Sequence, residues 1–186
     1  MDAFSYLSVV LSIIVGLAIT QVLQGYRLLL LARDRVRWDP LVLVWSGLML
    51  VFATQSWWAS FGLTHHARWD FLAFSAVELQ FVLLYVLAGL SLPDVPDEGV
   101  IDLRAHYERE RRPFFVVLLA LFASSLGKDL ALDGRLPGPA NVAAHAVFAA
   151  LAAAGLATRS RAVHIVLAAT AAVGVAIYIG ALFARL

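Results

Sequence analysis

Residues 4–30 read FSYLSVVLSIIVGLAITQVLQGYRLLL, and their first charged side chain is Arg27. A bilayer core about 30 Å thick is crossed by a helix of roughly 20 apolar residues, so this stretch is long enough to span a membrane. A cleaved secretory signal would carry a basic amino-terminal region, a shorter apolar run and a small-residue cleavage site. The stretch has none of these features, and we expect it to be a retained first span.

Five further stretches meet the same requirement of length and composition. They cover residues 40–62, 71–92, 113–132, 139–157 and 162–183. Three of them open on proline, at Pro40, Pro113 and Pro139, which suits the first turn of a helix because the missing N–H is not needed there. The runs are continuous rather than alternating, so they do not fit a β-barrel. The sequence predicts an all-α, polytopic transmembrane helix bundle of six spans, with residues 1–186 forming a single transmembrane domain.

The composition agrees with a membrane protein. Of the 186 residues, 62% are hydrophobic and 15% are charged, and the mean hydropathy is +0.84. One soluble core of this size cannot bury so many apolar side chains. A net charge of +1 gives no basic field for nucleic acid, and the absence of cysteine excludes disulfides and thiolate sites. Arginine outnumbers lysine thirteen to one, which is typical of a high-GC bacterial genome.

The basic residues are distributed unevenly between the two sides of the predicted bundle. Six spans place the connections 31–39, 93–112 and 158–161 on one side and both termini on the other. Ten of the fourteen basic residues lie in or beside these connections: Arg27, Arg33, Arg35, Arg37, Arg104, Arg109, Arg111, Arg112, Arg159 and Arg161. The other four are Arg68, Lys128, Arg135 and Arg185. The positive-inside rule therefore predicts a multi-pass inner-membrane protein with both termini extracytoplasmic.

The predicted cytoplasmic loop, residues 93–112, begins with two prolines and ends in a charged segment. Within residues 102–112, Arg104 and Glu108, and Glu108 and Arg112, have the i,i+4 spacing of a helix. We expect a short surface helix here, followed by a separate fourth span from Pro113. This helix is either a solvated element beside anionic headgroups or a docking site for a cytoplasmic protein partner.

A stripe of small and polar residues follows one face of the first span. Its members are four residues apart: Ser8, Ser12, Gly16, Thr20 and Gln24. Such a stripe marks a helix–helix contact in lipid, where helices associate by close packing and side-chain hydrogen bonds. The contact lies either inside the bundle or between copies in a homo-oligomer.

Polar residues at membrane depth gather in the predicted outer half. They are Gln55, Glu78, Gln80, Ser125, Lys128, Asp129 and His145. Ionisable groups at such depth are costly and mark a function or a buried pair. We expect these side chains to converge on a polar pocket that opens to the extracytoplasmic side.

Glu78 is the only acidic residue deep within a predicted span. Three roles are open for this residue. It could form a structural ion pair or hydrogen bond with Lys128, Gln55 or His145. Alternatively, it could be a proton- or cation-coupled site, or lie at a solvated rim of the bundle. Lys128 and Asp129 have a simpler alternative, because the run before them, residues 114–126, has only thirteen residues and is too short to cross the membrane. They then lie at the outer boundary, where a lysine side chain reaches the headgroups.

No cofactor, metal site or catalytic residue is predicted. Haem between helices needs two histidines at one depth, whereas His145 and His164 lie at different depths. The nucleophile-elbow, zinc-protease and phosphate-loop motifs do not occur. An intramembrane enzyme is therefore the least favoured class.

Two regions carry a resemblance to other proteins. They are Tyr6-Leu-Ser-Val with Gly16-Leu-Ala-Ile-Thr-Gln21, and Asp102-Leu-Arg-Ala-His-Tyr107 running into Arg111-Arg-Pro-Phe-Phe115. The chain resembles a group of small multi-spanning bacterial inner-membrane proteins that carry no assigned function. The resemblance implies the same six-span layout and brings no activity or ligand.

Two functions are expected from these features. The first is binding or conduction of a small solute or ion, a proton or cation, with Glu78 as the protonatable or cation-facing group. The second is a structural or regulatory membrane subunit that oligomerises through the first-span stripe and docks a partner through residues 102–112. Neither expectation identifies the solute or the partner.

Overall fold

The computed structural model describes residues 3–66 and 69–182. Arg68, Arg185 and the last residue of the sixth predicted span lie outside the described part. The six long helices are α1 (Ala3–Leu31), α2 (Pro40–Ser60), α3 (Phe71–Ser91), α4 (Leu103–Asp133), α5 (Pro139–Ala157) and α6 (Arg161–Leu182). Short elements join them: η1 (Arg33–Arg35), β1 (Val36–Arg37), η2 (Phe61–His65) and β2 (Ile101–Asp102).

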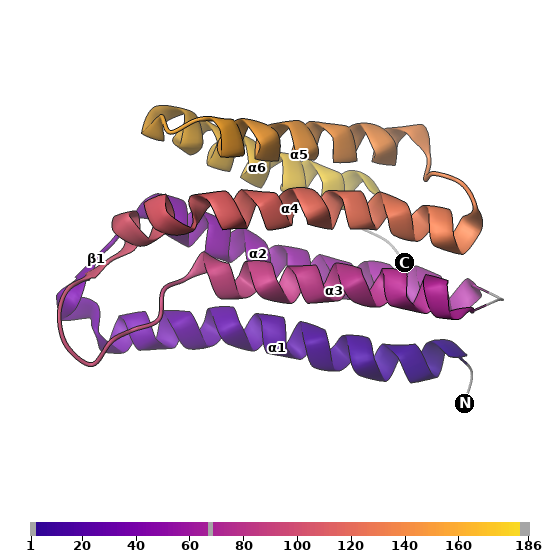
Figure 1. Ribbon diagram of the computed structural model, residues 1–186, viewed down its shortest axis with the longest axis horizontal. Helices are drawn as coiled ribbons and strands as arrows, with labels where there is room; N and C mark the ends of the chain where they lie inside the picture. The colour runs from indigo at the N-terminus through magenta and orange to yellow at the C-terminus, as the bar shows by residue number, and fades with distance from the viewer. Residues whose placement is uncertain (1–2, 67–68, 183–186) are drawn as a thin grey trace.

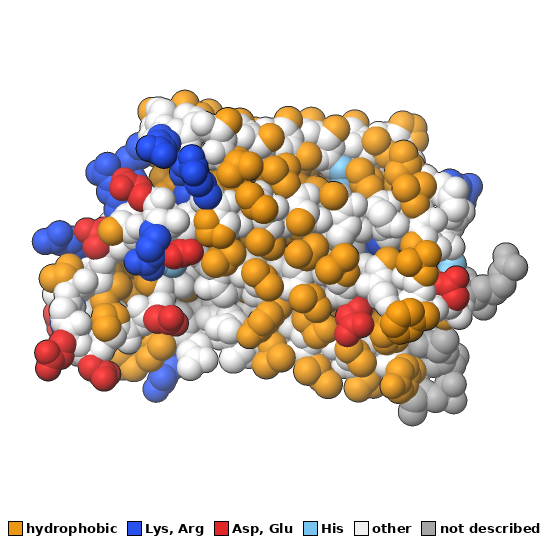
Figure 2. Space-filling model, viewed as in Figure 1, with side chains coloured by type: hydrophobic (Ala, Val, Ile, Leu, Met, Phe, Trp, Pro, Cys, Tyr) orange, Lys and Arg blue, Asp and Glu red, His pale blue; other side chains and the backbone are white. Residues whose placement is uncertain are grey.

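Six helices of the described chain are long and apolar enough to cross a membrane. This confirms the prediction of an all-α bundle and makes the chain a multi-pass membrane protein. Large apolar side chains are exposed on all six, including Ile13, Val51, Leu79, Val116 and Val166. Figure 2 shows this apolar surface along the length of the bundle, with most charged side chains gathered at the end that holds β1. We call this the arginine-rich end.

The helices run roughly parallel to the long axis of the molecule (Figure 1). In that view α3 lies between α1 and α4, α5 lies on the far side of α4, and α2 and α6 lie behind them. Figure 1 shows α1 beginning at the end opposite the arginine-rich end and α6 running toward that same end, as an even number of alternating helices requires.

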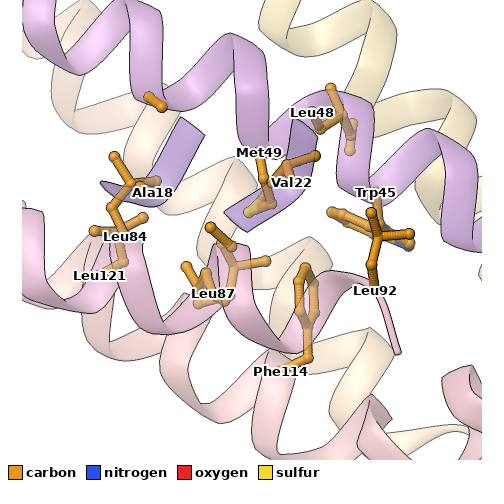
Figure 3. Close-up of a cluster of buried hydrophobic side chains, with 14 of the residues drawn as sticks. Ala18, Val22, Trp45, Leu48, Met49, Leu84, Leu87, Leu92, Phe114 and Leu121 are labelled. Carbon is orange, nitrogen blue, oxygen red and sulfur yellow. The ribbon is translucent and has the colours of Figure 1, made fainter. Parts of the chain in front are cut away.

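The core is built mainly from the inward faces of α1 to α4, and small side chains of α5 and α6 complete it: Ala152, Ala168, Ala171 and Val175. Figure 3 shows Val22, Met49, Leu84 and Leu87 among the side chains that point toward one another from these four helices. Trp45 of α2 meets the rings of Phe114 and Phe115 of α4 edge-on, each at 5.4 Å between centroids. All three aromatic rings are at most 5% exposed. Apolar side chains therefore fill the interior of the bundle on the side of the arginine-rich end.

Helix α4 differs from the sequence expectation. It runs without interruption from Leu103 to Asp133 and contains Pro113, so the surface helix and the fourth span are one element. The segment before Pro113 is held by contacts that the sequence pattern does not reveal. His106 Nε2 lies 3.2 Å from the Leu90 carbonyl oxygen and Tyr107 Oη 2.8 Å from His164 Nδ1. These contacts offset the one backbone hydrogen bond that proline removes.

A capping carboxylate and a strand pair fix the start of α4. Asp102 accepts a hydrogen bond from the Ala105 N–H at 3.0 Å, and this bond lowers the pKa of the Asp102 carboxyl. The parallel pair β1–β2 places Arg37 beside Asp102, at 3.5 Å between Nη1 and Oδ2. The loop before α4 is thereby tied to the α1–α2 connection.

The small-residue stripe of α1 faces away from the bundle. The helix packs inward through other positions: Leu7, Leu11, Val15, Ala18 and Val22 are at most 5% exposed. Most of the stripe is exposed, at Ser12, Gly16, Thr20 and Gln24, and Ser8 is half-buried. Ser12 Oγ donates back to the Ser8 carbonyl oxygen at 2.6 Å. Within one chain, the stripe is therefore not the face through which α1 packs.

Candidate functional site

A cavity of about 770 Å³ lies at the end of the bundle opposite the arginine-rich end, between α2, α3, α4, α5 and α6. Regular helical spacing brings its side chains together. On α2, Phe52, Gln55, Ser56 and Ala59 follow the i, i+3, i+4, i+7 pattern of one face, and all four line the cavity. On α5, Asn141, His145 and Phe148 follow the same rule.

Six of the seven side chains predicted to converge line this cavity. They are Gln55, Gln80, Ser125, Lys128, Asp129 and His145. The amides of Gln55 and Gln80 make no hydrogen bond to any residue in the described part of the chain, so both keep donors and acceptors available toward the cavity.

Glu78 does not line the cavity. Successive helical residues are turned by about 100°, so positions 78 and 80 lie on nearly opposite sides of α3. The side of α3 that carries Glu78 also carries Phe74, whose ring lies 6.5 Å from that of Tyr6, and Tyr85, which accepts from Gln21 at 3.0 Å. Glu78 therefore lies on the α1 side of α3. It makes no ion pair or hydrogen bond with Lys128, Gln55 or His145, which was one of the three roles expected for it.

His145 is held in a defined orientation on the cavity wall. Its Nδ1 lies 2.9 Å from the Asn141 carbonyl oxygen, which only accepts, so Nδ1 carries a proton. Its Nε2 lies 3.0 Å from Ser125 Oγ and, in the neutral ring, accepts the serine proton. His145 is only 9% exposed. This contact joins α5 to α4 across the cavity.

Lys128 and Asp129 are neighbours in α4 and form an ion pair, with 3.1 Å between Nζ and Oδ1. Their side chains are 20% and 21% exposed. Both lie inside a helix that continues to Asp133, and both line the cavity. The pair neutralises itself but leaves each group in reach of a bound molecule.

Sequence reasoning missed two charged residues of the cavity. Asp133 and Arg135 line it as well, on the last turn of α4 and the connection to α5. Asp133 Oδ1 lies 3.7 Å from His66 Nδ1 of the α2–α3 connection. Both residues lie at the end of a predicted span. Charged side chains are common at such positions in membrane proteins, so the sequence did not indicate that these two belong to a cavity. With them, the lining holds two acidic and two basic side chains besides the histidine.

Aromatic rings also line the cavity. Phe122 and Phe148 are stacked at 5.8 Å between centroids, and Tyr178 meets Phe148 edge-on at 6.1 Å. Tyr178 also donates to Asn141 Oδ1 at 3.4 Å. Beyond them Leu118 and Phe115, at most 3% exposed, belong to the packed core. Within residues 3–66 and 69–182, no three His, Asp or Glu side chains are grouped to hold a metal ion.

Comparison with protein-family models, with curated proteins and with solved structures finds no match to this chain. Function is therefore inferred from the geometry of the site.

Proposed function

We propose that the cavity binds a small polar solute that is uncharged or zwitterionic. The observation that carries this proposal is the composition of the lining. Two acidic and two basic side chains balance in charge, and the amides of Gln55 and Gln80 have no hydrogen-bond partner in the described chain. A solute that offers both donors and acceptors satisfies such a wall better than a lone cation or anion does.

Binding is favoured over conduction. A conduit needs polar groups on both sides of its binding site, whereas buried apolar side chains lie between the cavity and the arginine-rich end. Trp45, Phe115 and Leu118 are at most 5% exposed there. A water-filled path through this region would expose these side chains at an unfavourable cost in free energy. We therefore place solute uptake and release at one end of the bundle.

A ligand screen tests the proposal. The purified full-length chain is heated in detergent with amino acids, small amides, polyols and monovalent cations, and the melting temperature is recorded. We expect a polar neutral or zwitterionic solute to raise it. Gln55→Leu/Gln80→Leu should raise the half-saturating concentration of that solute by about tenfold or more, since two hydrogen bonds together contribute roughly 1–3 kcal/mol to binding.

The matched control is Glu78→Gln, which changes an α3 residue next to the site but outside its lining. It should leave the half-saturating concentration unchanged. A solute response lost in Glu78→Gln and kept in the double variant would place binding on the α1 side of α3. Stabilisation by cations alone would favour an ion site instead.

We also propose that the bundle lies in a bacterial inner membrane with its arginine-rich end in the cytoplasm and both termini outside. The support is the placement of ten of the fourteen basic residues in or beside the connections at one end. The cavity then opens to the extracytoplasmic side. Since the chain has no native cysteine, single cysteines at Arg33 and Gly138 can be labelled in intact cells with an impermeant thiol reagent. Labelling of Arg33→Cys but not of Gly138→Cys would show that the protein has the opposite orientation in the membrane.

One observation favours a second role, as a subunit of a homo-oligomer. The exposed stripe at Ser12, Gly16, Thr20 and Gln24 leaves room for close helix approach, and a Cβ added to Gly16 meets no atom within 4 Å. Gly16→Leu should then reduce crosslinked dimers in membranes. Gly89→Leu, at another open glycine, serves as the control. Equal crosslinking in both variants would contradict this role.

A further inference from the structure

A second cavity, of about 450 Å³, lies at the arginine-rich end, where α5 gives way to α6 beside α4. Five arginines line it: Arg109, Arg111, Arg112, Arg159 and Arg161. Figure 2 shows basic side chains clustered at this end of the bundle. The cavity shares no lining residue with the proposed solute site.

The walls of this arginine pocket are fixed by interactions across four segments. Arg111 is 7% exposed, and its Nη1 donates to the carbonyl oxygens of Gly155 and Leu156 in the last turn of α5 and of Thr158, the residue after it. Arg161 Nη2 lies 2.6 Å from Asp39 Oδ2 at the start of α2. Two of the five arginines, Arg111 and Arg161, are therefore fixed in place by contacts between segments of the fold.

The pocket carries more positive charge than its neighbours neutralise. Asp39 pairs with Arg161 and Glu110 pairs with Arg109 at 2.7 Å. The remaining acid at the rim, Glu108, pairs with Arg104 at 2.9 Å. In the part of the chain that the structure describes, Arg112 and Arg159 have no ion pair or hydrogen bond, and Arg111 contacts only carbonyl oxygens. Three guanidinium groups around one cavity are thus left without a carboxylate.

We propose that this pocket binds a phosphate group, supplied by an anionic phospholipid headgroup. Guanidinium groups match the oxygens of phosphate in shape and charge, and a pocket surrounded by several of them favours a phosphate monoester or diester. Helix α6 begins at Arg161 with no acidic residue in its first turn, so its positive end faces the same edge.

A lipid is favoured over free phosphate because an apolar surface adjoins the pocket. Ile165 on α6 is 49% exposed and Val116 on α4 is 51% exposed. Each lies four residues, about one helical turn, beyond a pocket arginine on the same side of its helix, Arg161 and Arg112 respectively. Acyl chains can cover these side chains while the headgroup occupies the pocket, the arrangement expected where basic clusters meet a membrane surface.

The experiment measures the melting temperature of the full-length chain in a neutral detergent, titrated with short-chain phosphatidylglycerol, short-chain phosphatidylcholine or inorganic phosphate. We expect phosphatidylglycerol to raise the melting temperature at lower concentration than the other two. Arg112→Gln/Arg159→Gln should raise the half-saturating concentration of phosphatidylglycerol about 25-fold, since each arginine near a phosphate contributes roughly a factor of five. Both side chains are exposed and unpaired among the described residues, so the variant should melt like the wild type without lipid.

The matched control is Arg27→Gln/Arg33→Gln, which removes the same charge from exposed positions outside the pocket. It should change the half-saturating concentration by less than about twofold, because the pocket is left intact. Equal weakening in both double variants would reduce the effect to general surface charge and overturn the site. Equal protection by inorganic phosphate and phosphatidylglycerol would keep the phosphate site and overturn the lipid as its source.

Discussion

Single residues tie the bundle together at positions where the sequence shows only charge or polarity. Arg111 counts as one of ten basic residues in the orientation pattern, yet it is buried and closes the last turn of α5. The sequence places it on the correct side of a span but cannot reveal a partner 44 residues away. Gln55, Gln80 and His145 line one cavity, and the sequence singled them out because polar side chains at membrane depth are rare.

Arg111→Leu should destabilise the folded protein by about 2–3 kcal/mol, since three carbonyl oxygens lose a charged donor in a buried place. The measurement is equilibrium unfolding in mixed detergent. Arg104→Gln is the control, because that side chain is 59% exposed and pairs only with Glu108 on its own helix. Equal stability of Arg111→Leu and the wild type would show that water replaces the arginine at the end of α5.

Helix α4 is the element in which sequence and structure differ most. Proline at position 113 predicts a helix start, and the charged residues before it predict a separate surface helix. Both patterns are local. The continuous helix depends on contacts with Leu90 and His164, which are distant in sequence from Pro113. The other five helices were predictable from apolar length alone, because the bilayer sets that length.

Pro113→Ala should stabilise the protein by about 1–2 kcal/mol, because a proline inside a helix costs about 3 kcal/mol and part of the gain is lost to the freer unfolded chain. Pro139→Ala, at the first turn of α5, should give no such gain. The comparison is made by unfolding in detergent. No difference between the two variants would indicate that α4 is interrupted at Pro113.

The packing of α4 against α5 depends on a glycine. A Cβ added to Gly155 would lie 2.6 Å from the Phe115 ring, which is fully buried. Gly155→Ala should therefore cost about 1–3 kcal/mol in stability through overpacking. Gly89→Ala, where a Cβ meets no atom within 4 Å, should gain up to about 1 kcal/mol from helix propensity. Similar effects of the two changes would mean that the two helices move apart freely.

At the scale of the whole molecule, the two ends of the bundle differ. One end holds a charge-balanced polar cavity and the other an arginine pocket, with a packed apolar core between them. The sequence predicted the polar end, because six of its seven chosen side chains share the cavity. The sequence could not distinguish Glu78 from these six residues. It indicates how deep a residue lies along a span, but which side of α3 faces the cavity depends on the helices packed against it.

We propose above that the polar cavity opens to water at one end only and binds a polar solute. The most direct test is the labelling rate of Ser125→Cys by an impermeant thiol reagent, with Ser124→Cys as the control. Ser125 lines the cavity, whereas the adjacent Ser124 bonds the Leu121 carbonyl oxygen of its own helix. We expect rapid labelling of Ser125→Cys from the side of the α4–α5 connection only, and slower labelling when a solute from the screen is present. Labelling equal to that of Ser124→Cys, or equal from both sides of the membrane, would contradict it.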